Sequence, residues 1–310
     1  MDPLAPDLPP PRAFPWWGVL PVVLPWLWFL VRDHGAWTDP VAIALPAVAF
    51  VAFLAWAILT FFHRWVAAAT ALSLLAVCLV AIVGPRLPQR TAAPAHPIRI
   101  VSDNVFNTSQ WPGLAAETMT GRGADVIVSV EMGRSYWEHL QEYTTAYPYT
   151  AITGEQSILS RWPVEALPLA DGLPQDRIMR AALDVDGERV IVYAVHLFNP
   201  THETTFDAQQ RLLAQLVTAM DAETDPVIVA GDLNLSDRSE GYRMLDDHFA
   251  DAMRTGWWAA STYRHGLWRA LLLRIDQILV PLDWCTTDAE TFRVPGSDHM
   301  GVQATVGPCA

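Results

Sequence analysis

The 310-residue chain is apolar and acidic, with 52% hydrophobic residues, only 17% charged residues and a net charge of −13. Residues 1–96 hold five Arg and four acidic residues, whereas residues 97–310 hold fifteen Arg and 29 acidic residues. A domain this acidic has no basic stripe with which to neutralise phosphates, so tight nucleic-acid binding is not expected. The three Cys show no Cys/His spacing typical of a zinc site.

Three long stretches without charge dominate the N-terminal third. They cover residues 13–31, 40–62 and 65–85. A helix needs roughly 20 apolar residues to cross the hydrocarbon core of a bilayer. The sequence therefore predicts an N-terminal tail (1–12) and a membrane domain (13–85), with the lipid bilayer as a partner. We expect its three transmembrane helices at about residues 14–31, 41–62 and 65–84, the last two joined as a hairpin through His63 and Arg64.

Other interpretations of these stretches are weaker. Helices buried in a soluble protein rarely have uncharged runs this long. A cleavable signal peptide fits the first stretch poorly, because the flanking residues 1–12 are proline-rich and acidic and no small-residue cleavage site follows. Two Arg lie on one side of the predicted spans and three on the other, so the positive-inside rule leaves the orientation open.

A Pro/Ala-rich linker at residues 86–97 leads to a domain at residues 98–310 that is long enough to bury one core. Two of the Cys, Cys285 and Cys309, lie in this domain. A disulfide between them would fit an exported domain, and two free thiols fit the sequence equally well. We expect a multi-pass protein of the cell membrane with its C-terminal domain outside the cytoplasm.

Short β-rich segments alternate with helix-like segments after the linker. Strands are expected at residues 98–105, 125–130, 157–160, 181–185, 189–196, 226–230, 274–280 and 300–306, and helices at residues 114–121 and 206–220. The dipeptide Asp186-Gly187 is a hairpin signal between two of these strands. The pattern predicts an α/β fold with mixed or antiparallel strand pairing.

Carboxylate, amide and imidazole side chains stand at six of the predicted strand ends. In chain order they are Asn104, Glu131, His196, Asp232 with Asn234, Asp276, and Asp298 with His299. Each alone could be a turn former, a salt-bridged strand end or a core histidine. Strands packed side by side would bring them together at one rim. Carboxylate and amide oxygens suit Mg²⁺, Mn²⁺ or Ca²⁺, and a metal with His and Asp groups can hydrolyse a phosphoester.

Seven motifs in order resemble the endonuclease/exonuclease/phosphatase superfamily, the deoxyribonuclease I-like enzymes. They are SDNVFN, DVIVSVEM, SILSRWPV, VYAVHL, VIVAGDLN, RIDQILV and GSDHMGV. GDLN and SDH are each common by chance, but this order and spacing from residue 98 to 306 is specific. The resemblance implies a four-layer α/β sandwich with two central mixed β-sheets flanked by helices. It also implies a phosphoesterase that uses Mg²⁺, with Mn²⁺ or Ca²⁺ as alternatives.

The resemblance further implies a role for each polar residue on the metal and water side. Asn104 and Glu131 would bind the metal, with Asp298 as a second metal contact or an orienting group. Asp232 would orient or deprotonate the attacking water. Asn234 would hold that water or a phosphate oxygen.

The two histidines would act on the phosphate. His196 would contact the phosphate or assist the leaving group, and His299 would bind a phosphoryl oxygen while Asp276 polarises it. Two positions depart from the family pattern. Asp103 stands where an aromatic residue is frequent, so an added carboxylate could change metal affinity. Gln277 replaces the usual aromatic or His after RID, which is expected to alter packing more than chemistry.

Three functions follow from these motifs. The first is a membrane-anchored phosphoesterase that hydrolyses a phosphodiester or phosphomonoester, such as a phospholipid head group. The second is a membrane-tethered nuclease acting on DNA, against which the acidic domain argues. The third is a non-catalytic binding scaffold, which would have lost at least one of Glu131, Asp232 and His299; all three are present. A transporter is not expected, because the apolar stretches contain no charge that could form an ion pathway.

Overall fold

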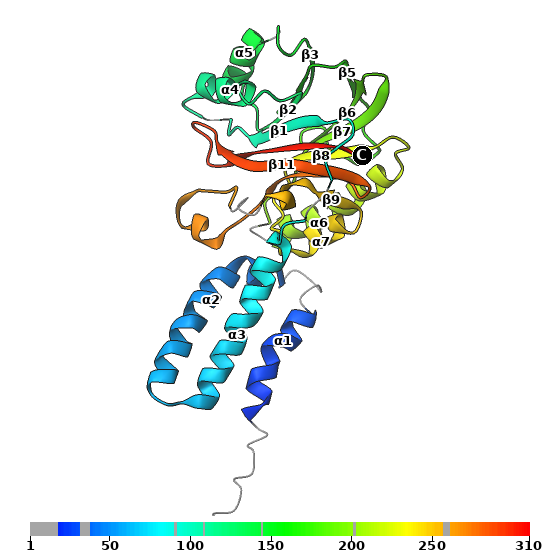
Figure 1. Ribbon diagram of the computed structural model, residues 1–310. Coiled ribbons are helices and arrows are strands. Elements are labelled where there is room, and N and C mark those ends of the chain that lie inside the picture. The colour runs from blue at the N-terminus through cyan, green and yellow to red at the C-terminus, as the bar shows by residue number, and fades with distance from the viewer. Residues whose placement is uncertain are drawn as a thin grey trace, which may run out of the picture.

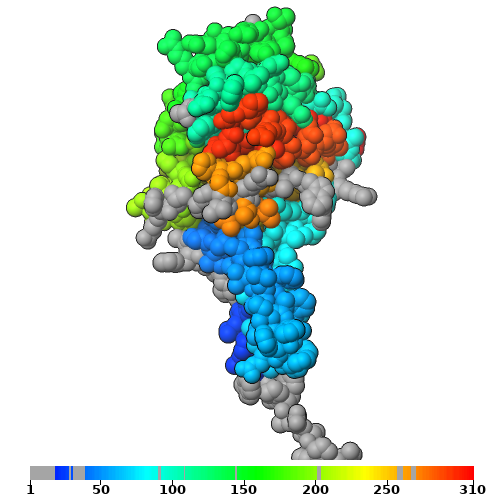
Figure 2. Space-filling view, turned by 90° about the vertical axis from the view of Figure 1, so that its left-hand side faces the viewer, coloured from blue at the N-terminus to red at the C-terminus, as the bar shows by residue number. Residues whose placement is uncertain are grey.

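The computed structural model describes residues 18–31, 38–89, 92–107, 109–143, 145–200, 203–256 and 261–310. It shows a stem of apolar helices and an α/β body (Figure 1). The space-filling view shows the stem projecting from one end of the body (Figure 2).

The stem contains helices α1 (Leu20–Val31), α2 (Thr38–Phe61) and α3 (Trp65–Val83). Helices α2 and α3 form the predicted hairpin, and His63 in the turn has a φ of 52°. Two segments, Asp39–Phe61 and Trp65–Arg86, are long and apolar enough to cross a bilayer, judged by length and composition. Their exposed side chains include Phe50, Val51 and Leu79, an apolar surface that lipid would cover.

The prediction of three transmembrane helices is not supported by the described residues, in which only two helices are candidates. Helix α1 has 12 residues, which at 1.5 Å per residue is roughly 18 Å, too short for a hydrocarbon core of roughly 30 Å. The helix begins beside Pro21, a residue that fits the first turn of a helix because its missing N–H is not needed there. Residues 13–17 of that predicted span lie outside the described residues.

The body is built on two six-stranded mixed sheets. The first has the order β11-β12-β1-β2-β4-β3, and its strands are β1 (Ile98–Asn104), β2 (Val126–Val130), β3 (Tyr149–Thr153), β4 (Gln156–Ser160), β11 (Trp284–Arg293) and β12 (Met300–Pro308). The second has the order β5-β6-β7-β8-β10-β9, and its strands are β5 (Val164–Leu167), β6 (Ile178–Val185), β7 (Glu188–His196), β8 (Val227–Asp232), β9 (Phe249–Asp251) and β10 (Asp276–Pro281). Among the described strands, only the pairs β1–β2 and β7–β8 are parallel.

Helices cover the outer face of each sheet, so the body has four layers. Helices α4 (Pro112–Thr120) and α5 (Arg134–Leu140) pack on the first sheet. Helices α6 (Glu203–Asp221) and α7 (Glu240–Asp246) pack on the second. Four short 3₁₀ turns complete the described elements: η2 (Gly84–Arg86), η3 (Gln141–Tyr143), η4 (Ala252–Thr255) and η5 (Gly266–Leu271). The predicted α/β sandwich with two mixed sheets is confirmed.

The stem is fastened to the body by polar contacts with α2. Pro46 lies inside α2 and has no N–H, so the carbonyl of Ala42 loses the hydrogen bond that a helix normally gives it. The buried Arg238 of the body supplies that bond, from its Nε to the Ala42 oxygen at 3.0 Å. Asp39, in the first turn of α2, accepts a hydrogen bond from the backbone N–H of Glu240 at the start of α7. These bonds fix the direction in which the stem leaves the body.

Cys285 and Cys309 form a disulfide that joins β11 to the residue just after β12. The structure thereby decides between the two states that the sequence leaves open. Cys78 is a free and fully buried thiol within the stem. It packs with Leu45 and Ile82, as expected for a cysteine that acts as a small apolar side chain.

Candidate active site

Strand alternation places the polar strand ends between the two sheets. In β7, Val190, Val192 and Ala194 face the core between the sheets, so the same two-residue period directs His196 to that side at the end of the strand. The same reasoning applies to β1. Ile98 and Ile100 face the inter-sheet core, so the two-residue period directs Asn104 to the same side. The hydrophobic pattern that builds the core therefore also aims the polar side chains at its edge.

Asp232 is the central one of the three site residues that the second sheet supplies. It pairs in register with His196 on the parallel strand β7 and with Asp276 on the antiparallel strand β10. Gly231 just before it has a φ of 137°, and a Cβ at that position would collide with the backbone oxygen of Val195. Glycine is thus required for β8 to approach β7 closely enough to bring Asp232 beside His196.

Glu131 reaches the site by breaking the alternation. Val126 and Val128 of β2 face the inter-sheet core, so a regular strand would turn Glu131 toward the helices on the other side. Instead Glu131 has a φ of 52°, a left-handed conformation that non-glycine residues seldom adopt. Such strained backbone is concentrated at functional sites. The turn brings the Glu131 carboxylate to the end of the neighbouring strand β1.

Asn104 joins the two sheets at this rim. Its Nδ2 donates to Glu131 Oε1 at 3.1 Å and to Asp232 Oδ2 at 3.1 Å, while its Oδ1 accepts from the backbone N–H of Phe106 at 3.1 Å. His196 Nε2 lies 3.3 Å from Glu131 Oε1 and 3.8 Å from Asp232 Oδ2. Asn104 and His196 therefore each lie against both Glu131 and Asp232, which joins four of the residues singled out in the sequence into one cluster.

Asn234 holds the Asp232 carboxylate from the following loop. Its backbone N–H donates to Asp232 Oδ1 at 2.9 Å, and its Nδ2 lies 3.3 Å from Asp232 Oδ2 and 3.0 Å from the oxygen of Leu197. Asn234 also has a positive φ of 49°, which asparagine tolerates better than most residues. The GDLN motif thus forms a tight turn around one carboxylate.

His299 and Asp276 form a buried pair beside Asp232. The distance between His299 Nδ1 and Asp276 Oδ2 is 2.8 Å, and His299 is only 6% exposed. Burial alone would lower the pKa of His299, but the carboxylates of Asp276 and Asp232 and the hydrogen bond to Asp276 together raise that pKa well above its ordinary value. A protonated His299 directs its other nitrogen, Nε2, toward Asp232 Oδ2 at 3.8 Å.

Three residues that the motifs did not single out orient this pair. Thr262 Oγ1 accepts from the backbone N–H of Asp276 at 3.1 Å, and Ser297 Oγ accepts from that of His299 at 3.0 Å. The ring of Tyr263 lies 5.1 Å from the His299 ring, edge to face. Ser297 belongs to the GSDH motif and could have been found there. Thr262 and Tyr263 lie in a loop without any sequence signal.

Asp298 stands apart from the predicted metal pair. Its carboxylate lies 3.9 Å from His299 Nε2 and 4.0 Å from His265 Nδ1. Within the described part of the chain, no hydrogen bond or ion pair joins it to Asn104 or Glu131. Asp298 Oδ1 and Asp232 Oδ2 therefore lie near the same nitrogen of His299, with Asp298 at the partly exposed rim of the site.

The two departures from the family pattern lie outside the cluster. Asp103 adjoins Asn104 on β1 and is completely buried, and burial, followed by the nearby Asp276, raises its pKa well above the ordinary value. By alternation its side chain points to the opposite face from Asn104. Gln277 is also buried, and its Nε2 donates to the oxygen of Leu235 at 3.2 Å. Gln277 thus supports the loop that follows Asn234.

The donor set fits a divalent cation. Asp232, Asp276 and His299 have possible ligand atoms within 4.8 Å of one another. His299 Nδ1, however, is already held by Asp276 Oδ2 at 2.8 Å, and the raised pKa of His299 favours the protonated ring, which has no lone pair for a metal. Glu131 and Asn104 are the better ligands, because they adjoin each other at the rim and carboxylate and amide oxygens are of the kind that Mg²⁺ prefers. A cation would also offset the like charges gathered here.

Comparisons with known proteins agree with this geometry. The profile of the Endonuclease/Exonuclease/phosphatase family matches residues 101–299. The chain belongs to this family and is a hydrolase of the nuclease and phosphatase type. No curated protein matches the chain significantly.

Many solved structures share the fold at low sequence identity. An endonuclease/exonuclease/phosphatase from Beutenbergia cavernae DSM 12333 is 18% identical with a TM-score of 0.55, over 69% of this chain and 72% of that chain. A humanized TDP2 of D. rerio with 14 mutations is 19% identical with a TM-score of 0.56, over 69% and 100%. An AP endonuclease from Archaeoglobus fulgidus is 18% identical with a TM-score of 0.53, over 67% and 98%. At these identities the likeness concerns the fold alone.

Proposed function

We propose that this chain is a membrane-anchored, Mg²⁺-dependent phosphoesterase that hydrolyses a phosphodiester or phosphomonoester by in-line attack of water. The observation that carries the proposal is the cluster in which Glu131, Asn104 and Asp232 meet the His299–Asp276 pair. The site brings together a carboxylate that can hold a metal (Glu131), a carboxylate that can activate water (Asp232) and an imidazole that can bind phosphate (His299).

Glu131 and Asn104 would hold the cation, with Asp298 nearby at the rim. The amide of Asn104 would turn so that Oδ1, which now accepts from Phe106, faces the metal. The cation would polarise a phosphoryl oxygen and offset the charge that develops in the transition state. Asp232 would orient the attacking water and accept its proton, because one of its oxygens faces the cluster while Asn234 fixes the other.

The histidines would act on the phosphoryl group. Protonated His299 would donate from Nε2 to a phosphoryl oxygen, and Asp276 would keep the ring oriented through Nδ1. His196 faces the same space from β7 and would contact the phosphate or assist the leaving group. Asn234 would hold the water or a phosphate oxygen through its amide.

The substrate class is proposed from the anchor and the charge. The two apolar helices of the stem would keep the site near a bilayer, which raises the effective concentration of a substrate that is also in the membrane. The acidic body, with 29 acidic residues against fifteen Arg in residues 97–310, repels polyanions. Phospholipid head groups are therefore the preferred substrates. A tethered nuclease is the second candidate, because an AP endonuclease shares the fold.

A panel of substrates tests the class of reaction. The full chain, purified in detergent, would be assayed with Mg²⁺ or Mn²⁺ against sphingomyelin, inositol phosphates, plasmid DNA and bis-p-nitrophenyl phosphate. We expect metal-dependent turnover that is highest on a lipid substrate and abolished by chelation with EDTA. Turnover highest on plasmid DNA would support the tethered nuclease instead. Absence of turnover with every metal and substrate would favour the non-catalytic scaffold.

We also propose that the body lies outside the cytoplasm, since a disulfide between Cys285 and Cys309 persists best in an oxidising compartment. Cys309 is exposed and Cys78 is buried in the stem. Intact cells treated with an impermeant reductant and then an impermeant maleimide should show labelling at Cys309. A Cys309→Ser variant serves as the control for specificity. Labelling that requires cell lysis would place the body in the cytoplasm.

A further inference from the structure

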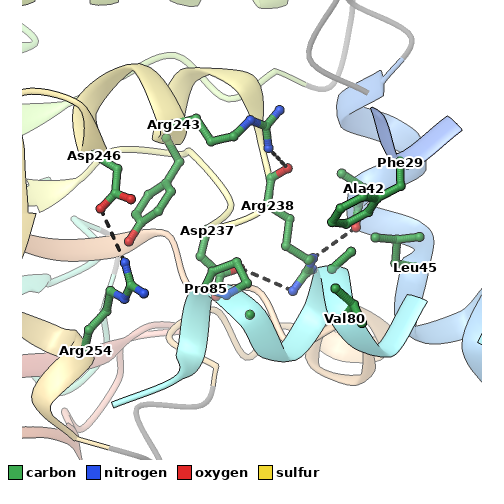
Figure 3. A pocket seen from close by; sticks show the side chains of 13 residues that line it. Phe29, Ala42, Leu45, Val80, Pro85, Asp237, Arg238, Arg243, Asp246 and Arg254 are labelled. Atoms are coloured by element: carbon green, nitrogen blue, oxygen red, sulfur yellow. Dashed lines mark hydrogen bonds and ion pairs between the residues drawn. The ribbon is translucent and has the colours of Figure 1, made fainter. Parts of the chain in front are cut away.

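A cavity of about 280 Å³ lies where the stem meets the body, away from the site described above. We call it the junction pocket. Its apolar wall comes from the stem and includes Leu45 of α2 and Val80 of α3. Its polar wall comes from the body and includes Arg238, Arg243 and Arg254 (Figure 3). The pocket is therefore amphiphilic, with charge on one side and hydrocarbon on the other.

The pocket lies at the level expected for lipid head groups. Helix α2 begins at Thr38 and α3 ends at Val83, and both of these ends adjoin the body (Figure 1). The chain between the two helices turns at His63, at the opposite end of the stem. If α2 and α3 cross the bilayer, the body-proximal ends stand at the interface between hydrocarbon and water. The apolar wall of the pocket then faces acyl chains.

Charge in the pocket is positive, in contrast to the acidic body. Asp237 lies between two guanidinium groups, with Arg86 Nε at 3.1 Å and Arg238 Nη1 at 3.3 Å. Asp246 lies 3.6 Å from Arg254 Nη1. Three Arg line the pocket together with two carboxylates, Asp237 and Asp246, and a wall rich in guanidinium groups suits an anion.

The Arg254 guanidinium has one nitrogen that can still donate a hydrogen bond to a ligand. Its side chain is only 14% exposed, and its Nε is buried without a hydrogen-bond partner among the residues that the structure describes. Buried donors in folded proteins nearly always have a partner. A phosphate oxygen in the pocket would accept from this Nε, while Nη1 and Nη2 donate to the side-chain oxygen of Gln89 at 3.0 and 3.2 Å.

We propose that the junction pocket binds the anionic head group of a membrane phospholipid, with the acyl chains lying along α2 and α3. The inference rests on the proposed membrane anchoring. The bound lipid would bridge the stem and the body through Arg254 and Arg243, next to the hydrogen bond from Arg238 to Ala42. The lipid would thereby hold the body at a defined height above the bilayer.

Lipid retention by the full chain tests the proposal. The protein would be delipidated in detergent and mixed with phosphatidylglycerol or phosphatidylcholine at equal mole fractions, and bound lipid would be measured by native mass spectrometry. We expect phosphatidylglycerol to be retained in preference. Arg243→Gln and Arg254→Gln should each lower its retention roughly fivefold, the value of one surface arginine near an anionic membrane. Arg134→Gln, on an exposed side chain of α5, should leave retention unchanged.

A second variant guards against a folding defect. A Cβ added at Gly84 meets no atom within 4 Å, so Gly84→Leu would fill the pocket without removing a charge. We expect it to abolish retention of phosphatidylglycerol while the melting temperature in lipid-free detergent stays the same. Equal retention of both lipids, or unchanged retention in Gly84→Leu and Arg254→Gln, would overturn the proposal. Displacement of the lipid by inorganic phosphate at millimolar concentration would instead assign the pocket to a soluble anion.

Flotation with vesicles separates this inference from the anchoring on which it rests. Wild type and Arg254→Gln should both float with phosphatidylcholine vesicles, because the apolar helices provide the anchor. A chain that floats but shows no preference for the anionic lipid would contradict the lipid site in the junction pocket and leave the membrane anchoring supported. A chain that does not float would contradict both.

Discussion

Replacement of Asp232 by Asn should lower the rate of metal-dependent phosphoester hydrolysis by a factor of about 10²–10⁴, the usual contribution of a positioned general base. The Asn side chain has nearly the same shape but cannot accept a proton from water. It would also place an NH₂ group against the donors of Asn104 and Asn234, which now point at one carboxylate oxygen. The loss would therefore fall on the chemical step and on the local order of the site.

Initial rates of wild type and Asp232→Asn on bis-p-nitrophenyl phosphate measure this effect. Asp171→Asn is the matched control, because Asp171 is an exposed carboxylate in a surface loop. The control should retain the wild-type kcat. Circular dichroism would establish that both variants are folded. If Asp232→Asn kept most of the wild-type rate, Asp232 could not be the group that activates water.

His299→Gln should reduce kcat by a factor of roughly 10²–10³, the cost of removing one donor to a developing oxyanion. His299 is buried, and Asp276 and Asp232 hold its pKa well above the ordinary value, against the opposing effect of burial. The charged donor is therefore in place at neutral pH. Glutamine can fill the space but offers a neutral amide without the charge.

His248→Gln provides a close control for that experiment. His248 also pairs with an aspartate, since its Nδ1 lies 3.0 Å from Asp221 Oδ1, but the pair is exposed on the surface. A loss confined to His299→Gln, with kcat of His248→Gln unchanged, would show that the position and burial of the pair matter. Equal activity in the two variants would remove His299 from the mechanism.

Much of the body could be predicted from its apolar strands. The runs that contain Val126–Val130 and Val227–Asp232 are β-branched and buried, so their period and length indicated strands directly. Strands β3, β5, β9 and β11 escaped prediction. All four lie at sheet edges, where one side is unpaired and the sequence need not alternate cleanly.

Site residues inside local sequence motifs could be predicted. Residues that reach the site through the folding of distant segments could not. Asp232 ends β8 and His299 directly precedes β12, and both lie inside recognisable motifs. The placement of Glu131 depends on a left-handed turn that breaks strand alternation, and no sequence rule gives that turn. Thr262 supports Asp276 from a loop whose position depends on the folded chain. The role of Asp298 as a second metal contact or an orienting group stays a prediction.

Hydropathy alone did not predict the helices of the stem correctly. Uncharged length alone predicted three spans, but α1 is 12 residues long in the described part of the chain. The bond from Arg238 to Ala42 joins residues 196 positions apart and depends on Pro46 freeing a carbonyl. Such a contact cannot be found from periodicity, because each partner has an ordinary role in its own segment.

The most direct test of the account is hydrolysis of bis-p-nitrophenyl phosphate by the full chain before and after removal of divalent cations. The account predicts turnover in Mg²⁺, loss of turnover in EDTA, recovery when Mg²⁺ is restored, and no recovery in Glu131→Gln at the same metal concentration. Turnover that persists in EDTA, or a Glu131→Gln variant as active as wild type, would contradict a metal-dependent site built on Glu131.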